Sequence, residues 1–175
     1  MAAIQLTKNE LKKQRDSLVL FSRYLPTLQL KKQQLQTVLR RISEELENKR
    51  MKLEDDLEEI DEWVSVMGEP FEFEKYIVVK EVKVKSVSIG GIQLPVFDSV
   101  IYDKFSYDLF TVPLWADSAI DKAKQLKSQT IEIDILKKQY ELLNEELTVT
   151  TQRVNLFEKV KIPQAKEIIR RVQIA

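Results

Sequence analysis

Two stripes of mostly apolar residues, each repeating every seven residues, constrain this chain more than any other feature of its sequence. The first stripe lies in the N-terminal third of the chain and contains two rows set three residues apart. One row is Leu11, Leu18, Leu25, Lys32, Leu39, Leu46, Leu53 and Ile60. The other row is Gln14, Phe21, Leu28, Leu35, Ile42, Lys49, Asp56 and Trp63. Two such rows are typical of a left-handed coiled-coil seam, and a slide toward Leu57 and Val64 predicts that the seam drifts near residue 60.

The second stripe lies in the C-terminal part of the chain and is less regular. Its first row is Ala119, Leu126, Ile133, Tyr140, Leu147, Val154, Lys161 and Ile168, flanked by Leu136, Leu143 and Phe157. Polar residues interrupt the partner row at Lys122, Gln129, Thr150, Gln164 and Arg171. Residues 148–151 also have low helix propensity, so packing must hold that section helical. The sequence therefore predicts a second coiled-coil seam in which polar residues interrupt one of the two rows.

Capping and breaking residues predict where the two helices begin and end. Thr7 and Glu10 form a capping box, so the first helix should start near Lys8. Gly68 and Pro70 form its stop signal. For the second helix, the cap is either Thr111, before Pro113, or Asp117, before Ser118. Pro26 and Pro163 fall inside the stripes, and each predicts a kink. At Pro26 a kink is favoured over a break because the first stripe keeps its phase there.

The segment between the stripes changes to a period near two. Residues 77–87 are rich in β-branched side chains and predict a strand, Gly90 and Gly91 predict a turn, and residues 92–97 predict a short return strand. Pro95 lacks a backbone donor, so the return strand should lie at an edge or end there. Residues 98–112 are aromatic but unpatterned and are expected to pack the hairpin against the helix ends.

The predicted fold class is mainly α: a long antiparallel two-helix coiled coil formed by the N- and C-terminal helices, with a small central β-hairpin insert. One elongated domain would comprise an N-terminal helix (1–66), the hairpin and its connections (67–115), and a C-terminal helix (116–175). Heptads of this kind are compatible with pairing within one chain and with pairing between chains.

Composition argues against several classes of function. Lys plus Arg equals Asp plus Glu at 28 each, so no net charge favours nucleic acid. The chain has no His and no Cys, which removes the commonest general base and metal ligand and fits a reducing compartment. We therefore expect no catalytic residue, cofactor site, metal site or small-molecule ligand. With no signal-like or membrane-spanning run, a cytoplasmic location is expected, peripheral to a membrane at most through partners.

Three local patterns have both a structural and a functional interpretation. The acidic run at residues 54–62 is best explained as a solvated helix face, with a partner-binding face as the alternative. Lys32 and Lys49 fall in inward rows, where lysine fixes register or reaches the edge of the seam; contact with another protein chain is the alternative. Gly90-Gly91 lacks the following Lys-Ser or Lys-Thr of a phosphate loop and is a hairpin turn.

Residues 152–163 carry the most specific motif. Arg153-Val154-Asn155 is followed by Phe157-Glu158 and then by Ile162-Pro163. This spacing resembles the signature of the D subunit of V-type and archaeal-type ATPases, in which R-V-N-x-L-E precedes an isoleucine and a proline. Residues 7–11, 28–35 and 87–97 are similar to that family's start, first helix and central hairpin. Tyr24, Pro26 and Gln33 depart from the family's usual residues.

The resemblance implies a non-catalytic central-stalk subunit, the rotor axle of a rotary ATPase in proton or sodium transport or ATP synthesis. Its implied partners are the catalytic A/B hexamer, the F subunit and a membrane-rotor adaptor subunit of the C/d type. Arg153, Asn155, Lys159 and Ile162 are expected to contact the hexamer cavity, and Gly90 and Gly91 the lower or F subunits. The alternative is a generic coiled-coil scaffold or secretion adaptor, which would explain the heptads but not the signature.

Overall fold

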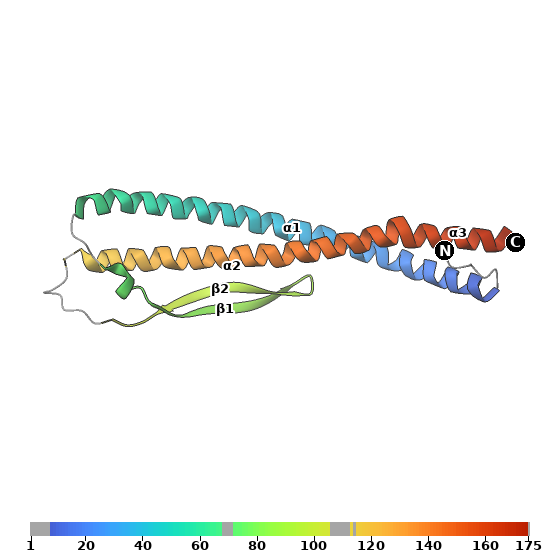
Figure 1. The fold of residues 1–175 in the computed structure, drawn as a ribbon, viewed down its shortest axis with the longest axis horizontal. Helices are drawn as coiled ribbons and strands as arrows, with labels where there is room; N and C mark the ends of the chain where they lie inside the picture. Colours follow the sequence, from blue (N-terminus) through green and yellow to red (C-terminus); the bar gives the residue numbers. More distant parts are fainter. Residues whose placement is uncertain (1–7, 68–71, 106–112, 114, 175) are drawn as a thin grey trace. The chain divides into compact units, whose positions relative to one another are not determined.

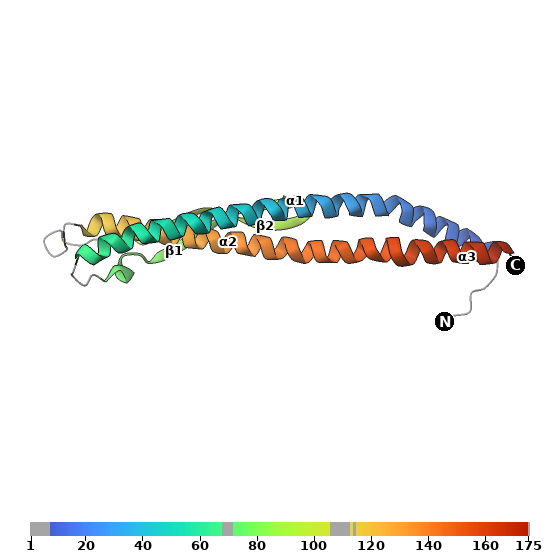
Figure 2. The same ribbon diagram turned by 90° about the horizontal axis from the view of Figure 1, so that it is seen from above.

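The computed structural model describes residues 8–67, 72–105, 113 and 115–174. Its elements are α1 (Lys8–Met67), the 3-10 turn η1 (Phe73–Lys75), β1 (Val79–Ile89), β2 (Ile92–Tyr102), α2 (Ala116–Asn155), the π-helical segment η2 (Leu156–Lys161) and α3 (Ile162–Ile174). Figures 1 and 2 show the long helices and the hairpin that lies between them in the chain. The predicted fold class, two long helices with a central β-hairpin, is confirmed.

The sequence signals for the helix ends have mixed outcomes in the residues that the structure describes. α1 begins at Lys8, ends at Met67 and continues through Pro26, so Pro26 does not break it. The residues behind two of the signals, Thr7 and Gly68, lie outside the described residues. For α2, the prediction that Asp117 is the cap is wrong, because the amide of Ala119 donates to the carbonyl of Trp115 and the helix already includes Ala116. The alternative cap, Thr111, lies outside the described residues.

The chain forms two compact units, which we describe separately. Unit 1 comprises residues 1–38 and 143–175. Within it, Lys31 and Glu146 form an ion pair of 2.6 Å across the two helices, and the rings of Phe21 and Phe157 lie 5.2 Å apart. Since the partner number rises as the α1 number falls, the helices of this unit run antiparallel. Its buried side chains are Leu35, Leu143, Thr150, Val154 and Ala165.

Unit 2 comprises residues 39–142, which include the rest of α1, the hairpin and the start of α2. Its helices are also antiparallel: Lys49 pairs with Glu132 at 2.9 Å, and Lys122 pairs with Glu59 at 3.0 Å. The buried side chains of the unit are Leu39, Ile42, Leu94, Ala116, Ile120, Ile133, Leu136 and Gln139. Three of its secondary structures, α1, β2 and α2, therefore contribute to its core.

The two inward rows predicted for α1 are confirmed wherever side chains are described, because every described member is buried or half-buried. The predicted drift of the seam is wrong at Leu57, which is 48% exposed. Asp56 keeps its inward position instead, because Gln129 and Lys122 of α2 bind its carboxylate. In α2 the inward assignment of Tyr140 is wrong: its ring is exposed, whereas Gln139 is buried because it binds the hairpin.

A shift in the seam follows the π-helical segment η2. A π turn holds one residue more than the α turn it replaces, so the inward positions beyond it move by one. The predicted inward residues Lys161, Gln164 and Arg171 are exposed, whereas Ala165 is buried and Val172 is half-buried. The polar interruptions in this part of the predicted stripe therefore point outward, and the next residue in each case faces inward.

The return strand is longer than predicted, and the first strand, predicted at residues 77–87, begins and ends two residues later. β1 and β2 pair antiparallel from Ile89 opposite Ile92 to Val79 opposite Tyr102, with register shifts between Val79 and Glu81 and between Lys83 and Val84. β2 does not end at Pro95 or Phe97, and residues 98–102, expected to be unpatterned, belong to it. Residues 106–112 of the same predicted segment lie outside the described residues.

The hairpin is fixed to α2 at two places along β2. The Gln139 side chain donates from Nε2 to the carbonyl oxygen of Pro95 at 2.5 Å, and the Tyr102 hydroxyl donates to the carbonyl oxygen of Lys124 at 2.7 Å. Seven strand residues at ~3.3 Å and fifteen helix residues at ~1.5 Å both span about 23 Å. Strand and helix therefore match in length between the two contacts. Leu94, next to the first contact, is 1% exposed.

Candidate subunit-contact surfaces

The signature segment presents polar side chains on the surface of unit 1. Arg153 and Asn155 lie in the last turn of α2, and Lys159 lies in η2; all three are exposed. Val154, between the first two, is buried at 4% exposure, and Ile162 is half-buried. The segment thus combines one anchoring residue with three side chains that are open to another protein.

The π-helical turn explains how Pro163 fits into this segment. The amide of Ile162 donates to the carbonyl of Phe157, five residues earlier, as a π turn requires. Proline has no amide hydrogen and its ring crowds the carbonyl four residues before it in an α-helix. The wider turn relieves that crowding, so the chain continues as α3 (Figure 1). The turn also leaves Leu156 and Val160 on the surface.

The predicted turn residues Gly90 and Gly91 form the two-residue loop of the hairpin. Their φ angles are +61° and +86°, values that favour glycine and are typical of a type I′ turn. Both residues are exposed, and a Cβ placed on Gly91 would meet nothing within 4 Å. The loop is therefore an open tip in unit 2, whereas the four signature residues belong to unit 1.

Sequence reasoning missed a group of exposed apolar side chains on the part of α1 in unit 1. Val19 is 68% exposed, Leu20 49% and Tyr24 52%. Their signal was present, because they are apolar residues outside both inward rows, and large exposed apolar groups mark interaction surfaces. They add an apolar part to the polar surface of the same unit.

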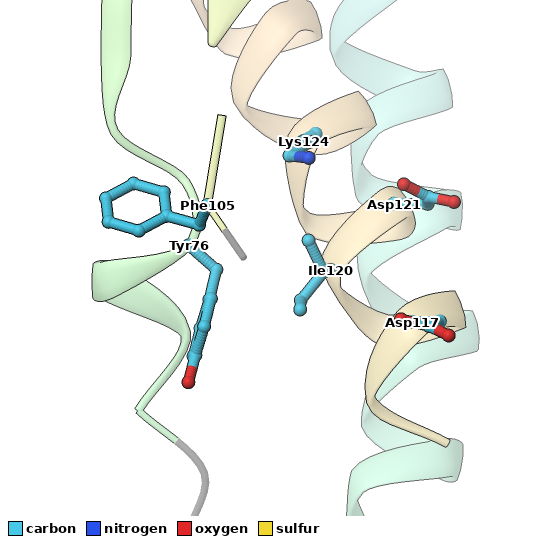
Figure 3. A pocket seen from close by; sticks show the side chains of 6 residues that line it. All are labelled: Tyr76, Phe105, Asp117, Ile120, Asp121 and Lys124. Atoms are coloured by element: carbon cyan, nitrogen blue, oxygen red, sulfur yellow. The ribbon is translucent and has the colours of Figure 1, made fainter. Parts of the chain in front are cut away.

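A cavity of about 350 Å³ lies in unit 2 beside the start of α2. Tyr76 and Phe105 approach each other edge to face, with ring centroids 6.1 Å apart, on one side of it. Asp117, Ile120, Asp121 and Lys124 of α2 line the other side (Figure 3). The lining therefore combines two aromatic rings with one isoleucine and three charged side chains of α2.

A polar cluster interrupts the apolar seam of unit 2. Gln129 donates from Nε2 to Oδ2 of Asp56 at 2.8 Å, and Nζ of Lys122 lies 3.7 Å from Oδ1 of Asp56. The Gln129 hydrogen bond, and then the nearby charge of Lys122, lower the pKa of Asp56 despite opposing desolvation. The hydrogen bond to Glu59 raises the pKa of Lys122. Such a cluster fixes one pairing of the helices, because a shifted register would leave these groups unpaired.

Replacing Asp56 with asparagine is expected to reduce stability at neutral pH but not in acid. A carboxyl group with a lowered pKa stabilises the fold above its unfolded pKa, near 3.8, and that contribution is lost as pH falls through the lower folded value. The melting temperatures of wild type and Asp56→Asn should therefore converge as pH falls from about 5 through the lowered folded pKa of Asp56. Asp55→Asn, at an exposed neighbour, serves as the control; an equal pH dependence for both variants would contradict the assignment.

Metal clusters and membrane spans are both absent from the part of the chain that the structure describes. In the described ranges, no group of three or more acidic, histidine or cysteine residues is arranged to hold a metal ion. Among the described helices, none has both the length and the apolar composition needed to cross a membrane.

Comparison with known proteins gives a consistent result over nearly the whole chain. Residues 10–175 match the family of ATP synthase D subunits. The chain is 47% identical over 174 residues to the V-type ATP synthase D subunit of Borreliella burgdorferi, covering 99% of this chain and 86% of the relative. It is 32% identical to the V-type ATP synthase D subunit of Chlamydia muridarum, covering 98% of this chain and 86% of that relative. The corresponding protein of Chlamydia pneumoniae is 27% identical over 98% of this chain and 83% of its own length.

Proposed function

Because this chain belongs to the family of ATP synthase D subunits, in which it is a non-catalytic subunit, we propose that it is the central stalk of a V-type ATP synthase. As the rotor axle, it transmits torque between a catalytic A/B hexamer and a membrane rotor. The complex couples ATP synthesis or hydrolysis to the transport of protons or sodium ions. The chain itself is peripheral to the membrane on the cytoplasmic side, held there through the complex.

One observation carries the proposal: in unit 1, α1 pairs antiparallel with the end of α2, and the side chains of Arg153, Asn155 and Lys159 lie on the surface. The side chains of Leu35, Leu143 and Val154 are buried in the seam of this unit, and Lys31 forms an ion pair with Glu146. An axle needs resistance to bending and twisting, which paired helices without internal glycine supply. No glycine lies within α1, α2 or α3.

Unit 1 is the part proposed to enter the hexamer cavity. Arg153, Asn155 and Lys159 supply hydrogen-bond donors and charge, and Ile162 adds a half-buried apolar group beside them. The exposed Val19, Leu20 and Tyr24 give the same unit apolar contacts that a rotating joint can make without fixed hydrogen bonds. The Gly90-Gly91 tip is proposed to contact the F subunit or the C/d-type adaptor. A scaffold or secretion adaptor would leave the family match unexplained.

A reversible cross-link tests rotation directly. The chain has no cysteine, so Arg153→Cys provides a single thiol, to be joined by a disulfide to a cysteine on the cavity wall of the hexamer. The assembled complex should lose nearly all ATP hydrolysis on oxidation and recover it on reduction, because the axle would be tied to the stator. The same variant without the partner cysteine is the control. Unchanged hydrolysis at complete cross-linking would contradict the axle role.

A further inference from the structure

The outer strand of the hairpin has an open backbone edge. The sheet has two strands in the part of the chain that the structure describes, and β2 lies between β1 and α2 (Figure 1). β2 residues are mostly buried or half-buried, whereas residues 83–88 of β1 are all exposed. Val84 and Val87 are 46% and 43% exposed, which is unusual for β-branched side chains.

The register shows which backbone groups face away from β2. In a two-residue hairpin the pair next to the turn, here Ile89 and Ile92, exchanges hydrogen bonds, and bonded pairs then alternate with non-bonded pairs. Val87 and Lys85 therefore bond to β2. Val84, Ser86 and Ser88 direct their amide and carbonyl groups outward.

Pro95 provides an independent check of this alternation. It lies opposite Ser86, in a non-bonded pair, so its missing amide hydrogen removes no hydrogen bond between β1 and β2. Its carbonyl points away from β1 and accepts the hydrogen bond from Gln139. The outer edge of β2 is thus bound by α2 at this point, and the outer edge of β1 is the one left open. No register shift interrupts β1 from Val84 to Ile89.

We propose that this open edge of β1, at Val84, Ser86 and Ser88, binds an extended acidic strand of a neighbouring subunit, which joins the sheet as a third strand. The inference rests on the proposed function, since the neighbour is a subunit of the same complex. Strand addition uses main-chain hydrogen bonds for affinity and side chains for specificity. β1 carries Lys80, Lys83 and Lys85 against one acid, Glu81. Lys85 pairs with Asp98 of β2, so Lys80 and Lys83 supply the remaining positive charge. This charge favours an acidic strand and disfavours a second copy of β1.

Amide hydrogen exchange of the wild-type protein tests the inference without any mutation. In the isolated chain, the outward amides of Val84, Ser86 and Ser88 should exchange faster than the inward amides of Lys85 and Val87. In the purified, complete ATP synthase complex, the outward amides should slow at least tenfold. Outward amides that exchange equally fast in both states would overturn the inference.

Ser86→Pro removes one outward amide while leaving the bonds to β2 intact. The variant should bind the neighbouring subunit about tenfold or more weakly, because one strand hydrogen bond is lost and its acceptor is left unpaired. Ser86→Ala is the matched control, since it also loses the hydroxyl contact with Gln93 but keeps the amide. Val87→Pro, which breaks a bond to β2, shows the effect of a disrupted hairpin. Replacing Lys80 and Lys83 with glutamate should weaken binding more than replacing them with glutamine.

The outcomes separate the two proposals. A Ser86→Pro chain that keeps its hairpin and assembles with wild-type affinity would overturn the strand-addition inference while the axle role stands. A wild-type chain that joins no other component of the ATP synthase would contradict the proposed function, and this inference with it.

Discussion

Replacing Leu35 with alanine is expected to lower the free energy of unfolding by about 2–5 kcal/mol, because the truncation removes a buried side chain and leaves a cavity. Leu35 is 1% exposed in the seam of unit 1. Leu143, on the opposite helix of that unit, is 0% exposed, so Leu143→Ala should lower the free energy of unfolding by a similar amount. Denaturant unfolding followed by circular dichroism measures both changes.

Leu30→Ala is the matched control for this prediction. It removes the same atoms from the same helix and the same unit, but Leu30 is 56% exposed, so its cost should stay within about 0.5 kcal/mol. Equal losses at Leu30 and Leu35 would mean that the seven-residue rows do not define the buried face of α1. A small loss at both Leu35 and Leu143 would contradict the paired-helix core of unit 1.

The sequence predicted α1 well because its buried face obeys one simple period. All described members of its two rows are buried or half-buried, and even the inward Lys49 finds a carboxylate, Glu132, across the seam. The structure favours the register role for Lys49 over contact with another protein chain. The sequence could not supply the partner of each polar residue, which depends on the facing helix. Asp56 was assigned inward by its spacing, yet nothing local identified Gln129 and Lys122 as the groups that hold it there.

α2 was harder to predict because it packs on more than one element. It faces α1 and also β2, so the side chains on its buried face include Gln139 but not Tyr140. A fixed seven-residue count also fails beyond residue 155, since η2 adds a residue to one turn. The polar Lys161, Gln164 and Arg171 were a usable signal, because each is followed by a less polar residue that would restore the stripe after a shift of one.

The candidate contact surfaces were predicted in part. The signature motif and the glycine turn were found from the sequence, and the structure places Arg153, Asn155, Lys159, Gly90 and Gly91 on the surface. The open edge of β1 could not be found this way, because the alternation of valine and lysine describes a strand without showing which backbone edge is paired. That information comes only from the register with β2 and from the Gln139 contact.

Deleting Val160 should turn η2 into an ordinary α-helical turn and lower the free energy of unfolding by about 3 kcal/mol, because the Pro163 ring would then crowd the carbonyl four residues before it. Val160 is 39% exposed, so its own side chain contributes little to the core. α3 keeps its inward residues Ala165 and Val172 in phase, since the deletion removes the one extra residue of the π turn. The loss should therefore come from Pro163 alone.

Combining the Val160 deletion with Pro163→Ala tests whether Pro163 causes the loss of stability. The double variant should recover most of the lost stability, since alanine supplies an amide and fits an α-helix without crowding. Pro163→Ala alone should have a small effect, because the wide turn already accommodates either residue. Denaturant unfolding of the four proteins gives the coupling between the two changes. A double variant as unstable as the deletion would show that the cost lies in the missing residue, and that Pro163 does not require the π-helical turn.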